Sequence, residues 1–193
     1  MCFNAPVSLL TFFIGMISSI ILVNYGSEKY KLQNLVVGIF FMFIASVQLM
    51  EYIFWIDLDN KMGLNKIASI IGPLLIFGQP VIFFLIKILT NTKFNYLSPK
   101  VLPFIVLNII YTIYLLYYYS KYISNDNLIT NVNKKCSLLW PWTKYYKYGI
   151  FYLGMLVLSG WFAIDNTKYF SMVFLIIGLT AAISFGYFKT NFA

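Results

Sequence analysis

Histidine and arginine are absent from this chain of 193 residues, and charged side chains make up only 10% of it. Without histidine the chain has no imidazole for metal binding or for proton transfer near neutral pH. Without arginine no side chain can hold a phosphate or carboxylate through two parallel hydrogen bonds. Soluble domains carry about 25% charged residues, so polar surface is scarce here. These absences exclude histidine-based zinc hydrolases and favour a membrane protein.

Cysteine is also scarce, with only Cys2 and Cys136 in the chain. Two thiols are too few for a disulfide framework or an all-cysteine zinc site. The sequence contains no glycine-rich dinucleotide or phosphate loop and no His-Glu-x-x-His motif, so we expect no cofactor and no metal site. Three interpretations of the thiols stay open. They could form a disulfide in an oxidising compartment, Cys2 could be a nucleophile after loss of Met1, or both could be unreactive.

What the chain has instead is apolar sequence: 61% of its residues are hydrophobic and its mean hydropathy is +0.79. A helix that crosses a membrane needs about 17–25 apolar residues. The runs are continuous rather than alternating, which indicates helices and not a barrel. We therefore predict one all-α, polytopic transmembrane domain over residues 1–193. Its six expected spans cover residues 6–24, 34–56, 67–89, 101–119, 148–164 and 168–188.

The formal charge of +8 comes from lysines that are scattered between the apolar runs. They form no continuous basic face, so we expect contact with lipid headgroups and no nucleic-acid partner. No charged side chain precedes the first run, whereas Lys29 and Lys31 follow it directly. Cytoplasmic flanks carry an excess of lysine. The N-terminus is therefore predicted on the extracytoplasmic side.

Two patterns predict how the helices pack. Gly15 and Ser19 share a face of the first helix, as do Gly178, Ala182 and Gly186 in the last, and such faces let helix backbones approach closely. We expect this packing inside the bundle rather than in a dimer. The third run contains Gly72-Pro73 and Gly78-Gln79-Pro80. Because each proline removes a helical hydrogen bond, we predict a kinked helix there. Two interpretations stay open: a plain structural kink, or a broken helix of the kind that lines transporter sites.

A long polar and aromatic break spans residues 120–147. Its first half is typical of an irregular loop. Trp140 and Trp142 suit a segment that lies on the bilayer at the level of the headgroups.

Glu51 is the only acidic residue well inside an apolar run. It lies about five residues from the helix end, or about 8 Å deep at 1.5 Å per residue. Gln48, Glu51 and Trp55 have spacings of three and four, which place them on one helical face. An intramembrane carboxylate must pair, reach water or bind a proton. Two interpretations stay open: a functional site, or a side chain that snorkels to the membrane surface or pairs with Lys66.

The leading hypothesis is a pocket between the second and third helices, lined by Gln48, Glu51, Gln79 and Trp55. It would bind or pass a proton, a cation or a small solute. One alternative is a membrane-embedded enzyme in which Cys2 is the nucleophile and Glu51 the acid or base. The other is a scaffold without catalysis.

The opening Met-Cys-Phe-Asn-Ala resembles the Met-Cys-Phe-Ser-Ala signature of an uncharacterised family of multi-pass membrane proteins from bacteria and large DNA viruses. Gln48, Glu51 and Trp55 match that family's Gln-x-x-Glu-x-x-x-Trp pattern, and the similarity is fainter at Pro80 and at residues 136–142. Asn4 stands in place of the usual serine. The resemblance consists of short motifs spread over the chain and implies no particular reaction. It implies that Cys2, Gln48 and Glu51 act together.

Overall fold

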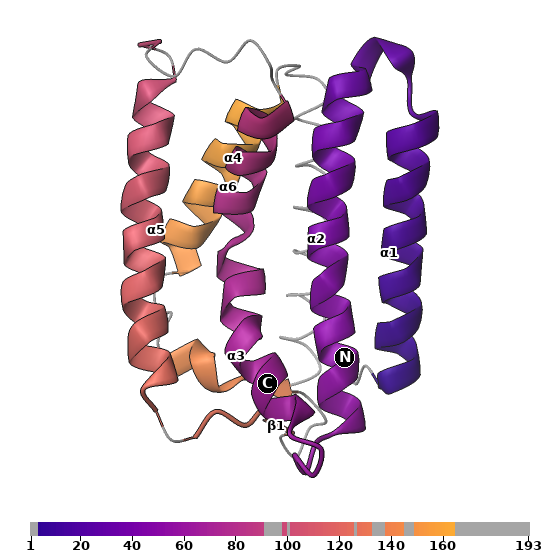
Figure 1. Ribbon diagram of the computed structural model, residues 1–193, viewed down its shortest axis with the longest axis vertical. Helices are drawn as coiled ribbons and strands as arrows, with labels where there is room; N and C mark the ends of the chain where they lie inside the picture. The colour runs from indigo at the N-terminus through magenta and orange to yellow at the C-terminus, as the bar shows by residue number, and fades with distance from the viewer. Residues whose placement is uncertain are drawn as a thin grey trace, which may run out of the picture.

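The computed structural model describes residues 4–90, 98–99, 101–125, 127–132, 138–144 and 149–164. This part of the chain forms six α-helices, which run roughly along the long axis of the molecule, with α3 and α4 end to end (Figure 1). The helices are α1 (Ala5–Tyr25), α2 (Lys31–Ile56), α3 (Leu64–Phe77), α4 (Gln79–Thr90), α5 (Leu102–Ile123) and α6 (Gly149–Ala163). Two short 3-10 helices, η1 (Glu28–Tyr30) and η2 (Pro141–Lys144), and the antiparallel strands β1 (Asn131–Val132) and β2 (Leu138–Leu139) complete the fold.

Within the described residues, three helical segments are long and apolar enough to cross a membrane: α1, the continuous segment Glu28–Ile56, and α5. The bent pair α3 and α4 would add a fourth if it forms one span. The prediction of a mainly helical chain with apolar helices long enough to span a membrane is confirmed, whereas the predicted number of six spans is not. The fifth predicted span is the 15-residue helix α6, which is short for a crossing. The sixth, residues 168–188, lies outside the described residues.

The outward surfaces of α1 and α5 are strongly apolar. Soluble monomers rarely expose large continuous apolar surfaces, so these faces fit contact with lipid. The most exposed side chains of this kind are Leu10, Phe13, Ile14, Ile17, Ile21, Ile109, Ile110, Ile113 and Leu116.

The third predicted span is divided in the structure, because α3 and α4 meet at Gly78 with a bend of 63°. Pro80 lies in the first turn of α4 and has no backbone N–H to donate. The N–H of Gly78 donates to the Leu74 carbonyl at 2.9 Å, and a Cβ on Gly78 would lie 2.2 Å from that oxygen. The predicted kink is confirmed, and its position is Gly78. Pro73 lies inside α3 without ending it.

Helix α1 packs closely against α2, and small residues make this possible. A Cβ added to Gly15 would lie 2.9 Å from the Cβ of Ala45, and one added to Gly38 would lie 2.4 Å from Val23 Cγ2. The Gly15 and Ser19 face therefore packs within the chain, as predicted. The second predicted small-residue face, Gly178 to Gly186, lies outside the described residues.

The buried apolar residues form two clusters. One joins α2, α4 and α6, where the rings of Phe40 and Phe83 stack at 3.9 Å. The other includes Met50, Phe54, Tyr122 and Trp142.

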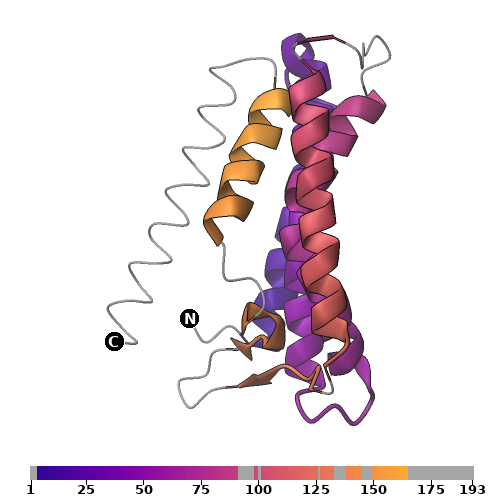
Figure 2. The ribbon, with the colours of Figure 1, turned by 90° about the vertical axis from the view of Figure 1, so that its left-hand side faces the viewer.

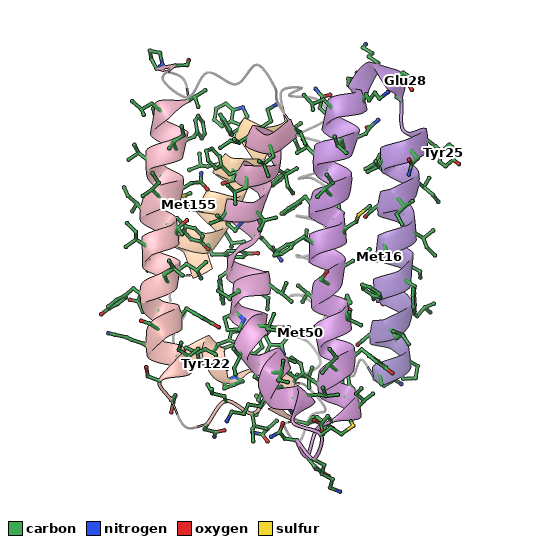
Figure 3. All side chains as sticks on the ribbon, in the orientation of Figure 1. Met16, Tyr25, Glu28, Met50, Tyr122 and Met155 are labelled. Atoms are coloured by element: carbon green, nitrogen blue, oxygen red, sulfur yellow. The ribbon has the colours of Figure 1, made fainter. Side chains whose placement is uncertain are left out.

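Figure 3 places Met50 and Tyr122 toward the lower end of the molecule and Glu28 at the upper end. Figure 2 shows α6 to one side of the layer that the other helices form.

Candidate functional site

The turn between α2 and α3 is organised by Asp57, the first residue after α2. Its Oδ1 accepts the backbone N–H of Met62 at 3.1 Å, and its Oδ2 accepts those of Leu64 at 2.8 Å and Asn65 at 3.2 Å. Asp57 thereby gives a hydrogen-bond acceptor to N–H groups at the start of α3 that have no partner within the helix. Burial acts to raise the pKa of this carboxyl, but the backbone hydrogen bonds outweigh burial, and the pKa lies below its usual value. Gly63 completes the turn with a positive φ of 74°.

A buried hydrogen-bond network joins α3 to the segment that follows α5. The Asn65 side chain donates to the Thr130 carbonyl and accepts the Thr130 N–H, both at 2.9 Å. The hydroxyls of Ser69 and Thr130 lie 2.8 Å apart, and Tyr122 donates to the Ser69 carbonyl at 2.9 Å. We call Asp57, Asn65, Ser69, Tyr122 and Thr130 the bundle-end network. It fixes residues 127–132, which the sequence predicted only as a polar loop, against α3.

Trp142 lies inside the bundle end and not on the bilayer surface, so the prediction for this residue was wrong. Its side chain is fully buried. Its ring lies near Phe54 and Tyr122, with centroid distances of 6.1 and 6.3 Å. A Cβ added to Gly72 would lie 2.6 Å from this ring, so Gly72 provides the space. Trp140 stacks on it at 5.4 Å. Burial of this large apolar ring against the cluster outweighs its preference for the interface.

Gln48, Glu51 and Trp55, which we call the α2 stripe, share one face of α2 because this helix is continuous from Lys31 to Ile56. At about 100° per residue, Glu51 is turned by about 100° from the core residue Met50, and Gln48 by about 60° from Ala45, which faces α1. By the same rotation Glu51 lies about 20° from Phe40 and Trp55 lies in line with Val37, so the stripe is on the side of α2 that carries these two buried core residues. All three side chains are half-buried.

Two polar atoms of the stripe are buried and have no hydrogen-bond partner in the described part of the chain: Oε1 of Gln48 and Nε1 of Trp55. Most buried polar groups in proteins have a partner. Among the described residues no hydrogen bond or ion pair reaches the Glu51 carboxylate. The two ion pairs in this part of the chain, Lys31–Glu28 and Lys61–Asp59, do not include it.

Lys66 does not pair with Glu51, so the predicted ion pair was wrong, whereas a snorkelling Glu51 stays a prediction. Its side chain is exposed, and its backbone N–H donates to Asn60 Oδ1 at 3.0 Å. As the third residue of α3, Lys66 turns to the solvent side of the helix, while Asn65 beside it turns inward.

Gln79 is buried at the start of α4, where it accepts a hydrogen bond from the Tyr152 hydroxyl of α6. It lies fifteen residues beyond Leu64, so its height above the α2–α3 turn is about 22 Å, against about 8 Å for Glu51. The structure therefore brings Gln48, Glu51 and Trp55 together on one helix and separates Gln79 from them. The lining of a single pocket by all four residues stays a prediction.

The two cysteines, Cys2 and Cys136, lie outside the described residues, so a disulfide or a nucleophilic thiol stays a prediction. In the described part of the chain, no three cysteine, aspartate or glutamate side chains gather as they would to hold a metal ion.

Comparison of the chain with known proteins finds no match. No protein-family model matches the chain, and neither a curated protein nor a solved structure matches it. The resemblance seen in the short motifs therefore stays a prediction.

Proposed function

We propose that this chain is a multi-pass integral membrane protein whose α2 stripe binds a proton or a small cation and lets it pass along the bundle. Glu51 would be the binding group, with the amide of Gln48 one turn away as a second oxygen ligand. Extracytoplasmic placement of the N-terminus belongs to the same proposal.

The observation that carries the proposal is an acidic side chain inside an apolar candidate span with no partner among the described residues. A charged carboxylate in that position is costly, and such residues usually bind protons, ions or substrates. A neighbour on the helix face adds to this argument. Among the described residues Gln48 Oε1, an acceptor, is buried without a partner, and an unsatisfied buried group costs about 1–3 kcal/mol. Oxygen atoms at this spacing suit a proton or a hard cation.

Flux measurements on protein reconstituted in liposomes test this function. We expect Glu51→Gln to lower proton or monovalent-cation flux about tenfold or more, because a contact with a charged group is worth about 1.5–3 kcal/mol. The matched control is Glu28→Gln. Glu28 is an exposed glutamate of η1 that pairs with Lys31, so its loss should leave the flux unchanged. Equal flux for the wild type and Glu51→Gln, across ions and pH, would contradict the proposal.

The alternative hypotheses, an enzyme that uses Cys2 and Glu51 and a scaffold without catalysis, stay predictions. Labelling with a thiol probe, read by mass spectrometry, addresses the first of them, because a nucleophilic Cys2 should react at neutral pH.

A further inference from the structure

A cavity of about 490 Å³ lies where α2 ends and the turn to α3 begins. Small-molecule sites have volumes of about 300–1,000 Å³, so this cavity has the size for a small organic ligand. Trp55 belongs both to its wall and to the α2 stripe, and Glu51 follows one helical turn deeper on the same face. The cavity is lined by Trp55, Ile56, Asp57, Leu58, Asp59, Lys61 and Met62.

The charges on the cavity wall favour a cation. Asp57 and Asp59 contribute two carboxylates and Lys61 one ammonium group, which leaves a formal charge of −1. The Asp59 and Lys61 side chains are exposed and lie 3.5 Å apart. Asp57 is held ionised by backbone N–H groups, so its charge is a fixed part of the wall.

The backbone of α2 adds negative potential at the same place. The final hydrogen bond at the end of this helix runs from the Asp57 N–H to the Ile53 carbonyl. The carbonyls of Phe54, Trp55 and Ile56 receive no backbone N–H from the described residues. Free carbonyls at a helix C-terminus carry a partial negative charge and favour cations.

The cavity wall also includes the aromatic residue Trp55, which favours organic ammonium ions over other cations. The indole of Trp55 is the side chain with the strongest attraction for an ammonium group over its face. A bare metal ion would occupy only a small part of a cavity of this volume, whereas an amine of the size of choline would fill more of it and contact the ring.

From the cavity, its charge and its ring together, we propose that the end of α2 binds a small organic ammonium ion and delivers it to Glu51. The delivery step rests on the proposed function; binding in the cavity does not. The same ammonium group occurs on free amino alcohols and on phospholipid headgroups.

Calorimetric titration of the purified full chain in a non-ionic detergent tests this proposal with choline chloride as the probe. We expect choline to bind, Asp59→Asn to weaken binding by up to about fivefold, and Lys61→Gln to strengthen it by a similar factor, because exposed charges interact on this scale. Trp55→Leu should weaken binding about two- to fivefold through loss of the ring. Glu28→Gln is the control and should bind as the wild type does.

Asp59 and Lys61 are exposed, so these variants keep the test valid even if Trp55→Leu fails to fold. Titration with a short-chain phosphatidylcholine separates the two sources: if only this lipid binds, with the same variant effects, the cavity takes an ammonium headgroup. Choline and lipid binding that are both absent, or that ignore Asp59, Lys61 and Trp55, would overturn the inference. So would inorganic phosphate binding that Lys61→Gln abolishes.

The two proposals can fail separately. Choline binding that depends on Asp59, together with equal flux for the wild type and Glu51→Gln, would remove the proposed function and leave the cavity site. Flux that depends on Glu51 without choline or headgroup binding would do the reverse.

Discussion

Two groups of polar side chains lie within a few helical turns of each other, and the fold treats them in opposite ways. In the bundle-end network, Asn65 and Thr130 bond each other twice and Ser69 joins both. In the α2 stripe, the buried polar atoms of Gln48 and Trp55 have no partner. The network stabilises the position of a loop. The stripe lowers the free energy of unfolding, because its buried polar atoms have no hydrogen-bond partners among the described residues.

On the proposed function, the network has a structural role and the stripe a functional one. A fold that satisfies one buried group and leaves its neighbour unsatisfied usually does so at a site that binds something. Variants of the bundle end should therefore change stability, and variants of the stripe should change flux. The predictions below test this division, from the largest expected effect to the smallest.

The largest loss of stability is expected from Trp142→Ala, which removes the ring that fills the bundle end. Removal of a buried tryptophan costs about 3–5 kcal/mol. Thermal unfolding in detergent, followed by circular dichroism, measures this loss. The control is Trp161→Ala, because Trp161 of α6 is 57% exposed. A loss no larger than that of the control would show that residues 138–144 are not docked in the bundle.

Asn65→Ala should have the next largest effect, a loss of roughly 1–3 kcal/mol, because the N–H and carbonyl of Thr130 would be buried without partners. The same unfolding measurement applies. Asn24→Ala is the matched control, since Asn24 is exposed on α1 and bonds only the Ile20 carbonyl within its own helix. Equal stability of the two variants would mean that the network does not fix the loop.

Asp57 predicts a dependence of stability on pH. Because its pKa is lower in the folded chain than its usual value of 3.8, its contribution is complete above that value and is lost as the pH falls through the folded pKa. The melting temperature of the wild type should therefore fall below about pH 4. Asp57→Asn should lower the melting temperature at neutral pH and flatten this fall. A profile as steep as that of the wild type would contradict the role of Asp57 as the cap of α3.

Gln48→Leu should have the smallest effect on stability and the opposite sign. The variant removes an amide oxygen that has no partner, so we expect no loss or a gain of up to about 1 kcal/mol. Its proton or cation flux should fall. Destabilisation as large as that of Asn65→Ala would show that Gln48 is a structural residue and would break the comparison between the two groups.

The helices and the kink could be predicted from the sequence because they depend on local pattern. The run 6–24 became α1, the run 101–119 became α5, and Pro80 indicated the bend. The α2 stripe could also be predicted, since a lone carboxyl at position 51 stands out in an apolar run.

The bundle end could not be predicted. Asn65 and Thr130 are separated by 65 residues, and periodicity does not indicate which loop folds back. Trp142 follows an aromatic pattern that is equally typical of a membrane surface. Gly72 leaves space for the ring of Trp142. In the sequence, however, a glycine followed by a proline indicates only a kink.

The central claim, that Glu51 is the group that binds the cation or proton, is tested most directly by infrared difference spectroscopy. Spectra of the reconstituted wild type and of Glu51→Gln would be compared as protons or cations are added. We predict a change in the carboxyl bands of the wild type that is absent from the variant. Identical difference spectra for the two proteins would contradict the claim.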